Sequence, residues 1–180
     1  MSELIKSLLT YSNLSNTSFT SEKTDLNSVM REVISDLELS ISEKKAKIKL
    51  DQLPVVNAIP MQMYQLFLNI FSNSLKFTTK APVIKVSAEL IDKQTAKNNL
   101  HTTGEKDYWK ISIADNGIGI EEKFNEQVFK LFQRLHLKNE YPGTGVGLSI
   151  VKRIVENHNG LIRLDSTPKK GTTITIYLPA

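Results

Sequence analysis

The chain has 180 residues, of which 40% are hydrophobic and 23% charged, so it is long enough for one globular domain with a single core. It contains no cysteine, which excludes disulfides, thiolate metal sites and a cysteine nucleophile. The net charge of +4 comes from lysines interspersed with acids, which favours a solvated surface over a nucleic-acid-binding one. The first 14 residues are too few and too polar for a signal peptide or a membrane span.

The first half of the chain is predicted to be mainly helical, because its apolar residues recur at three- and four-residue spacing. Two of the helices also carry start signals, an aspartate suited to an N-cap and a proline suited to a first turn. In chain order we expect a short amphipathic helix at 4–11, a Ser/Thr/Asn-rich linker at 12–24, a helix capped by Asp25 that ends near Lys45, a strand at 48–50 and a helix at 60–79.

In the second half, apolar and polar residues alternate in the way typical of strands. We expect strands at 84–90, 109–113, 161–166 and 172–178, a long mobile loop at 92–107, and a helix at 146–158 closed by Asn159-Gly160. The residues expected to face the core from the first two strands are Ile84, Val86, Ala88, Leu90, Trp109, Ile111 and Ile113. This mixture predicts an α/β two-layer sandwich, with a mixed, mostly antiparallel sheet of about five strands and three main helices on one face.

The helix at 60–79 carries a polar stripe, formed by Gln62, Gln65, Asn69, Asn73, Lys76 and Lys80. Such a stripe on its own indicates the solvent face of an amphipathic helix. However, the apolar share of this helix is too wide for a surface helix, and asparagine is a weak helix former. Amide oxygens one turn apart, followed by a lysine, are instead suited to hold a hydrated Mg²⁺ ion and phosphates.

Two glycine clusters indicate a ligand pocket. The first, Gly117 and Gly119, follows Asp115 at the end of a strand, and the second contains Gly143, Gly145 and Gly147 directly before a helix. Three glycines in alternation let the backbone approach a ligand closely, and the helix N-terminus behind them favours a polyanion. Asp115 is either a turn aspartate or a carboxylate that accepts a hydrogen bond from an exocyclic amine such as that of adenine.

The segment between the glycine clusters is aromatic and basic. Phe124, Val128 and Leu131 would share one helical face, and core packing is the favoured role of Phe129 and the other aromatic residues. In the same segment, Arg134 is either simply exposed or reaches a terminal phosphate as a charge-assisted donor. Because glycines flank it, the segment is predicted to be a mobile lid over a nucleotide pocket.

The order of these motifs resembles that of one protein family. Asn69-x-x-x-Asn73, Asp115-x-Gly117-x-Gly119, Phe129-x-x-Phe132-x-Arg134, Gly143-x-Gly145-x-Gly147 and Gly171-Thr172-Thr173 are similar to the N, G1, F, G2 and G3 boxes of sensor histidine kinases. That family belongs to the ATP-binding superfamily of gyrase, heat-shock chaperones and mismatch-repair ATPases. The amino-acid sequence at 132–136 and 141–145 is similar to that of kinases of the phytochrome and PAS-linked type.

The resemblance implies a role for each matched residue. Asn73 would be the Mg²⁺ ligand with Asn69 supporting it, Lys76 would contact phosphate, and Arg134 would lie near the terminal phosphate. Asp115 would bind the adenine amine. The other residues implied in ATP binding are Gly117 and Gly119 at the pocket floor, Gly143, Thr144, Gly145, Gly147 and Leu148 at the lid hinge and the helix start, and Thr172 on the far side of the adenine.

Two departures from the wider superfamily limit the activity. Branches that hydrolyse ATP place a glutamate general base where this chain has Asn69, and an amide cannot accept a proton at neutral pH. None of the histidines His101, His136 and His158 fits the family's phospho-acceptor, and His158, at a helix end, suits a favourable helix-dipole contact. We therefore expect this chain to be only part of an enzyme.

The resemblance implies the ATP-binding catalytic domain of a histidine kinase at 21–180, preceded at 1–20 by the end of a dimerisation helix and a linker. ATP and Mg²⁺ would be bound, and the γ-phosphoryl group would pass to a histidine of a separate dimerisation domain. Partners would be that domain, a response regulator receiver and a second copy in the full-length kinase, this fragment alone being a monomer. The setting would be cytoplasmic, without nucleic acid or membrane contact. The alternatives are a degenerate nucleotide-binding or scaffolding module, and an ATPase or serine kinase of the same fold, which Asn69 disfavours.

Overall fold

A computed structural model describes residues 5, 9, 11–12, 20–100, 105–133 and 143–180. Its centre is a five-stranded sheet in the order β2-β4-β5-β7-β6. β2 runs parallel to β4, and every other pair is antiparallel, so the predicted mixed, mostly antiparallel sheet of five strands is confirmed. The strands are β2 (Lys47–Leu50), β4 (Val83–Ile91), β5 (Tyr108–Asp115), β6 (Leu161–Thr167) and β7 (Gly171–Pro179).

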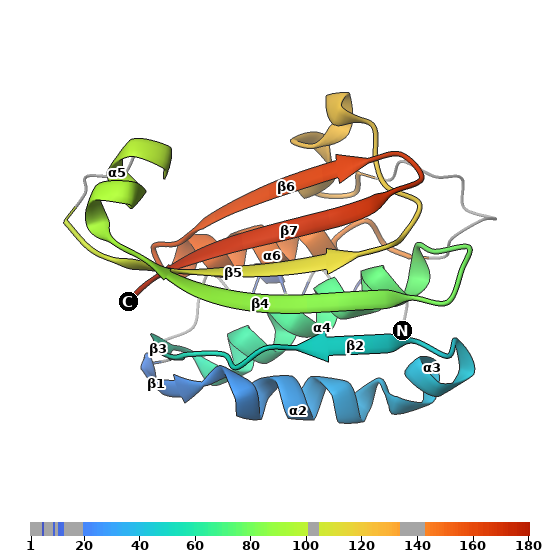
Figure 1. Ribbon diagram of the computed structural model, residues 1–180, viewed down its shortest axis with the longest axis horizontal. Coiled ribbons are helices and arrows are strands. Elements are labelled where there is room, and N and C mark those ends of the chain that lie inside the picture. The colour runs from blue at the N-terminus through green and yellow to red at the C-terminus, as the bar shows by residue number, and fades with distance from the viewer. Residues whose placement is uncertain (1–4, 6–8, 10, 13–19, 101–104, 134–142) are drawn as a thin grey trace.

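The helices α2 (Leu26–Asp36), α4 (Pro60–Lys76) and α6 (Gly147–Asn157) form the second layer, with α4 and α6 behind the sheet in the view of Figure 1. α4 packs against both α2 and α6, and its large side chains Phe67 and Phe71 are almost fully buried. The core between the layers is aliphatic and aromatic, and the alternating residues of β4, β5 and β7 complete it. The two-layer sandwich predicted from the sequence is therefore confirmed.

Local signals set the helix ends. Asp25 caps α2 as predicted, because its Oδ1 accepts the backbone N–H of Asn27 at 2.9 Å. The predicted helix at 25–45 is nevertheless interrupted at Leu37, which separates α2 from the short α3 (Glu38–Glu43). α4 begins with Pro60 in its first turn. α6 ends with Asn159 in the left-handed conformation (φ 53°), and the Gly160 N–H donates to the Val155 carbonyl, as the Asn-Gly signal predicted.

Three features differ from the prediction. The segment at 92–107 contains a helix, α5 (Lys93–Leu100), whose Ala96 is buried against Tyr177 on the outer face of the sheet (Figure 1). Asp92 caps this helix, because its Oδ1 accepts the N–H groups of Gln94 and Thr95. The polar composition of the segment had predicted a loop. A second sheet joins β1 (Glu22–Asp25), inside the expected linker, to β3 (Val55–Ala58). Leu90, expected in the core, is 53% exposed, and it lies in the part of β4 after Val86, where β2 no longer pairs with the strand.

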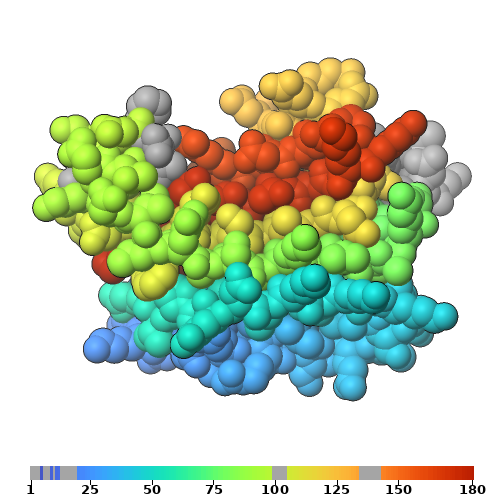
Figure 2. All heavy atoms as spheres, viewed as in Figure 1, coloured from blue at the N-terminus to red at the C-terminus, as the bar shows by residue number. Residues whose placement is uncertain are grey.

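The beginning of the chain is described at four positions only, and all four are helical, in agreement with the predicted first helix. Ile5 and Leu9 are about half exposed, whereas Tyr11 packs against the main core. In the part of the chain that the structure describes, no helix is long and apolar enough to cross a membrane. Figure 2 shows the outer face of the sheet, with α5 lying over one end of it.

Candidate functional site

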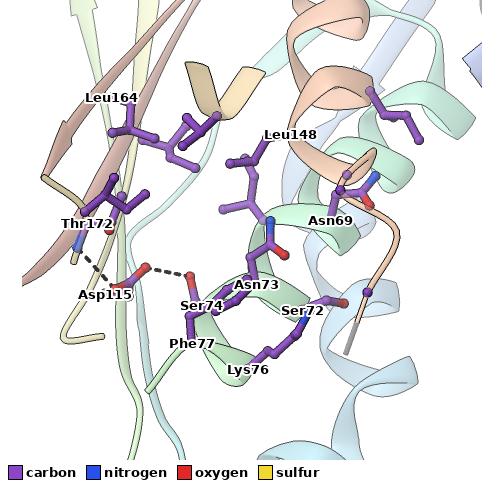
Figure 3. A pocket seen from close by; sticks show the side chains of 18 of the residues that line it. Asn69, Ser72, Asn73, Ser74, Lys76, Phe77, Asp115, Leu148, Leu164 and Thr172 are labelled. Carbon is purple, nitrogen blue, oxygen red and sulfur yellow. Dashed lines mark hydrogen bonds between the residues drawn. The ribbon is translucent and has the colours of Figure 1, made fainter. Parts of the chain in front are cut away.

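A pocket of about 420 Å³ lies between α4 and the end of β5, and the start of α6 and the strands β6 and β7 complete its wall. This volume is in the range of small-molecule sites. Figure 3 shows that the residues of α4 line one side, that Asp115 and Thr172 come from the sheet, and that Leu148 comes from α6. The apolar part of the lining consists of Ile70, Phe77, Ile118, Ile120, Val128, Leu148, Ile150, Leu164 and Ile174.

At one end of the pocket, three donors hold the Asp115 carboxylate. Its Oδ1 accepts the backbone N–H groups of Gly117 at 2.8 Å and Thr172 at 3.2 Å. Its Oδ2 accepts the hydroxyl of Ser74 on α4 at 3.0 Å (Figure 3). A carboxylate oxygen has two lone pairs, so Oδ2 can accept a further hydrogen bond from a ligand in the pocket.

The environment of Asp115 has two opposing effects on its charge. Burial raises the pKa of the Asp115 carboxyl above its ordinary value, because the charged form loses solvation. The hydrogen bonds from Gly117, Ser74 and Thr172 act in the other direction and favour the ionised form. The result is a desolvated acceptor in a fixed position, which is suited to recognise a hydrogen-bond donor on a ligand.

Glycines allow the close backbone contacts of this end. A Cβ atom at Gly119 (φ 69°) would lie 2.0 Å from the Thr167 carbonyl oxygen, and one at Gly171 (φ 119°) would lie 1.9 Å from the Asp115 carbonyl oxygen. Gly117 does not line the cavity, but a Cβ there would lie 2.5 Å from the Phe77 carbonyl oxygen. The predicted role of Gly117 and Gly119 in shaping the floor therefore agrees with the packing, and Gly171 shares it.

The opposite end of the pocket carries the amides of α4. Asn69, Asn73 and Lys76 all line the cavity, whereas Lys80 lies beyond the end of the helix and Gln62 is buried. The polar stripe is thus shorter than predicted. Asn69 donates its Nδ2 to the Gln65 carbonyl at 2.8 Å, and a Cβ at Gly147 would lie 3.2 Å from its Oδ1. A Cβ at this position would therefore require the Asn69 side chain to shift by a few tenths of an ångström.

The loop before α6 forms the edge of this end. Gly143, Thr144, Gly145, Gly147 and Leu148 all line the cavity, as the sequence predicted. Among the described residues, no side chain caps the N-terminus of α6. The positive end of the helix dipole therefore faces the cavity without a capping carboxylate or hydroxyl, and the Lys76 ammonium lies close to Gly143 in the same region. This end attracts anions.

The segment between β5 and the loop is less regular than predicted. In place of one helix it has two 3₁₀ turns, η1 (Glu122–Phe124) and η2 (Gln127–Phe129). Val128 and Phe129 pack against the core, but Leu131 is 38% and Phe132 48% exposed, so core packing is wrong for Phe132. An apolar pattern this short does not distinguish a 3₁₀-helix, with three residues per turn, from an α-helix, with 3.6. The predicted phosphate contact Arg134 lies outside the described residues.

Sequence reasoning missed four polar residues that line the pocket, namely Gln65, Ser72, Ser74 and Gln133. Gln65 belongs to the predicted polar stripe, but no role in binding was predicted for it from the sequence. Ser74 is the most informative of them, because it is only 4% exposed and contacts Asp115. The available signal was a second polar residue directly after Asn73, in the last turn of α4, where only one face of the helix was expected to be polar.

The histidine that the structure describes, His158, does not line the pocket. His158 is 8% exposed: its Nε2 accepts the Ile59 N–H at 3.0 Å, and its Nδ1 pairs with the Ile154 carbonyl at 2.7 Å. Because Nε2 accepts an N–H group, the ring is neutral, and burial also lowers the pKa of its imidazole. The Nδ1–H group then donates to a carbonyl in the last turn of α6, so the contact at the helix end is a neutral hydrogen bond that ties α6 to the residue before α4. His101 and His136 lie outside the described residues. Within the described ranges, no cluster of His, Cys, Asp and Glu could hold a metal ion.

Comparison with known proteins identifies the family. The sequence model of the histidine kinase-, DNA gyrase B- and HSP90-like ATPases matches residues 58–180. The chain belongs to this family, and within it to the ATPase domains of histidine kinases.

Among curated relatives, the phytochrome-like protein Cph1 of Synechocystis is 37% identical over 99% of this chain, and cyanobacterial phytochrome A of Nostoc is 36% identical over the same share. The chain spans about a fifth (22%) of the length of each. Full-length ShkA, solved in complex with AMPPNP, has the same fold, with a TM-score of 0.77 at 22% identity over 98% of this chain and 35% of that one.

Proposed function

We propose that the pocket binds ATP, with the adenine at the Asp115 end and the phosphates at the start of α6. The observation that carries this proposal is the polarity of the pocket. One end offers a fixed carboxylate that accepts a hydrogen bond, and the other offers an uncapped helix N-terminus beside Lys76. The apolar walls between the two ends suit a flat base, and the AMPPNP bound to ShkA is a nucleotide of the same kind.

The residues of α4 also fit a magnesium ion. Mg²⁺ prefers hard oxygen ligands, keeps several waters and is usually shared with phosphates. Asn73 is the proposed ligand and Asn69 supports it, since both carry amide oxygens and both line the phosphate end. The ion would neutralise the developing charge on the phosphates, while Lys76 and the α6 N-terminus contribute fixed positive charge. Gly143, Gly145 and Gly147 would form the hinge, with Thr144 and Leu148 beside it and Arg134 over the terminal phosphate.

The proposed reaction is transfer of the γ-phosphoryl group to a histidine imidazole on another domain. Phosphoryl transfer depends on positioning and charge neutralisation, which the residues of this pocket can supply without a covalent intermediate. At the position of Asn69 there is no carboxylate that could activate water, so the group is kept for an external nucleophile.

The proposed acceptor domain is the histidine-containing dimerisation domain of the same kinase, with residues 1–20 at its end. The other proposed partners are a response regulator receiver and a second copy of the kinase, in the cytoplasm, where ATP is available.

Incubation with γ-labelled ATP tests this function, with and without a matching dimerisation domain added in trans. We expect acid-labile label on that domain only, because phosphohistidine is lost in acid. Label on this chain that survives acid would instead indicate a serine kinase, and rapid phosphate release by the chain alone would indicate an ATPase. ATP binding without any transfer to the added domain would favour the scaffolding module.

The Asp115→Ala variant tests the pocket itself. We expect it to keep its fold and to bind ATP roughly 10- to 100-fold more weakly, because it loses a hydrogen bond to a charged group. Isothermal titration calorimetry measures the affinity, and circular dichroism checks the fold. An unchanged ATP affinity in a folded variant would place the nucleotide elsewhere.

A further inference from the structure

Ser74 stands out among the polar residues near the pocket, because the predicted machinery does not use it. It lies on α4 next to Asn73, lines the cavity and is 4% exposed. Serine is a weaker helix former than alanine, and a hydroxyl buried in a helix interior needs a partner. Its partner here is the Oδ2 atom of Asp115, at 3.0 Å.

The direction of this hydrogen bond is fixed by chemistry. An ionised carboxylate is only an acceptor, so the Ser74 hydroxyl must use its single hydrogen on Asp115. The other contacts of the carboxylate, from the N–H groups of Gly117 and Thr172, also leave it as an acceptor. Ser74 therefore has lone pairs but no spare hydrogen on the side that faces the cavity (Figure 3).

This pairing determines which ligand group can be accommodated. A 6-amino group, as on adenine, donates hydrogen bonds and finds the oxygens of Asp115 and Ser74 as acceptors. A 6-oxo group, as on hypoxanthine or guanine, presents an acceptor to the acceptor oxygens of Asp115 and Ser74 and finds no donor there, which is costly in a partly desolvated site. Without the Asp115 contact, the hydroxyl of Ser74 could rotate and donate to a 6-oxo group.

We propose that Ser74 is a positioning residue that holds the Asp115 carboxylate and makes the pocket select 6-amino over 6-oxo purine nucleotides. The inference rests on the proposed function, because it assumes that the base lies at the Asp115 end. It assigns to α4, otherwise used at the phosphate end, a second role in base recognition. Three elements then determine the selectivity: α4 through Ser74, the loop after β5 through Gly117, and β7 through Thr172.

The test measures the affinities of ADP and of inosine diphosphate (IDP) by calorimetry for the wild type and for Ser74→Ala. We expect the variant to bind ADP roughly tenfold more weakly, and IDP no more weakly than the wild type does, so that the ratio of the two affinities falls. The Ser74→Thr variant, which keeps a hydroxyl at this position, should restore the ratio. The matched control is Ser112→Ala, on the outer face of the sheet, which should change neither affinity.

The outcomes separate the two proposals. If the wild type binds ADP no better than IDP, or binds neither, the placement of adenine at Asp115 is wrong and the proposed function fails with it. If the wild type prefers ADP but Ser74→Ala lowers both affinities by the same factor, Ser74 is merely structural and this inference is overturned. The inference is likewise overturned if Ser74→Ala leaves the ratio of the ADP and IDP affinities unchanged.

Discussion

The two ends of the pocket are built in different ways. The end around Asp115 consists of strand ends tied together by backbone and side-chain hydrogen bonds, with glycines where a Cβ atom would collide with a carbonyl. The edge between β5 and α6 consists of short 3₁₀ turns and a glycine loop, and it leaves Leu131 and Phe132 partly exposed. The difference indicates that the base end is formed before a ligand binds, whereas the edge would complete its contacts only with a bound nucleotide.

The largest expected effect is that of Gly171→Ala, at the rigid end. Its Cβ would lie 1.9 Å from the Asp115 carbonyl oxygen, in a backbone conformation that side chains rarely adopt (φ 119°). We expect the free energy of unfolding to fall by about 2–4 kcal/mol and ADP binding to be lost. Urea unfolding and calorimetry measure the two effects.

Gly143→Ala is the matched variant at the edge. A Cβ there would meet only the end of the Lys76 side chain, but the positive φ of 159° adds backbone strain, so we expect the free energy of unfolding to fall by clearly less than in Gly171→Ala. If both variants were equally destabilised, the two ends would not differ in rigidity, and the comparison would be wrong.

Hydrogen exchange sharpens the comparison directly. We expect the amides of β5 and β7 to be protected in the nucleotide-free protein, and those of 122–133 and 143–147 to gain protection of about tenfold or more when ATP and Mg²⁺ are added. The Asp115→Ala variant serves as the control, since it should show little gain at the same ATP concentration. Exchange at 122–133 that ignores saturating nucleotide in the wild type would contradict a lid.

Asn73→Ala tests the phosphate end alone. We expect the affinity for Mg·ATP to fall roughly tenfold, because an amide oxygen for the metal is lost, while adenosine binds as in the wild type. Calorimetry with each ligand measures the difference. Asn98→Ala, an exposed asparagine on α5, provides the control for the substitution itself. Equal losses for Mg·ATP and adenosine would mean that the Asn73 amide is structural.

The accuracy of the sequence prediction also differs between the two kinds of region. Long elements with a clear period, such as α4 and β7, were predicted within a few residues, because burial imposes the pattern on their sequences. The pocket glycines and Asp115 were found because backbone geometry and charge restrict which residues can stand there.

The parts that sequence reasoning missed are those set by tertiary contact. β1 and β3 are four residues long and pair only with each other, so neither carries a pattern of its own. α5 is mostly polar, and its Ala96 is buried against Tyr177, some eighty positions away in the sequence. The contact between Ser74 and Asp115 likewise joins residues 41 positions apart, and no local pattern records it.

An effect on stability alone is expected far from both ends of the pocket, at His158, which follows the last turn of α6. The neutral ring accepts the Ile59 N–H on Nε2, and a proton on that nitrogen would remove the hydrogen bond. Burial lowers the pKa of the folded-state imidazole below the ordinary value of 6.5. Between the two pKa values the unfolded chain binds more protons, so the free energy of unfolding should fall as the pH drops below about 6.5 and level off below the folded-state pKa.

Urea unfolding between pH 5 and 8 measures this dependence, and His158→Gln isolates it. We expect the variant to be less stable than the wild type at pH 8, by about 1–2 kcal/mol for the buried hydrogen bonds, and the difference to shrink as the pH falls. ADP affinity should be the same in both proteins at pH 8, because Ile150, the last residue of α6 that lines the pocket, precedes His158 by eight residues, or about 12 Å along the helix axis. A difference in stability that stays constant across the pH range would show that the imidazole does not titrate between the folded and unfolded states, and that its role is packing alone.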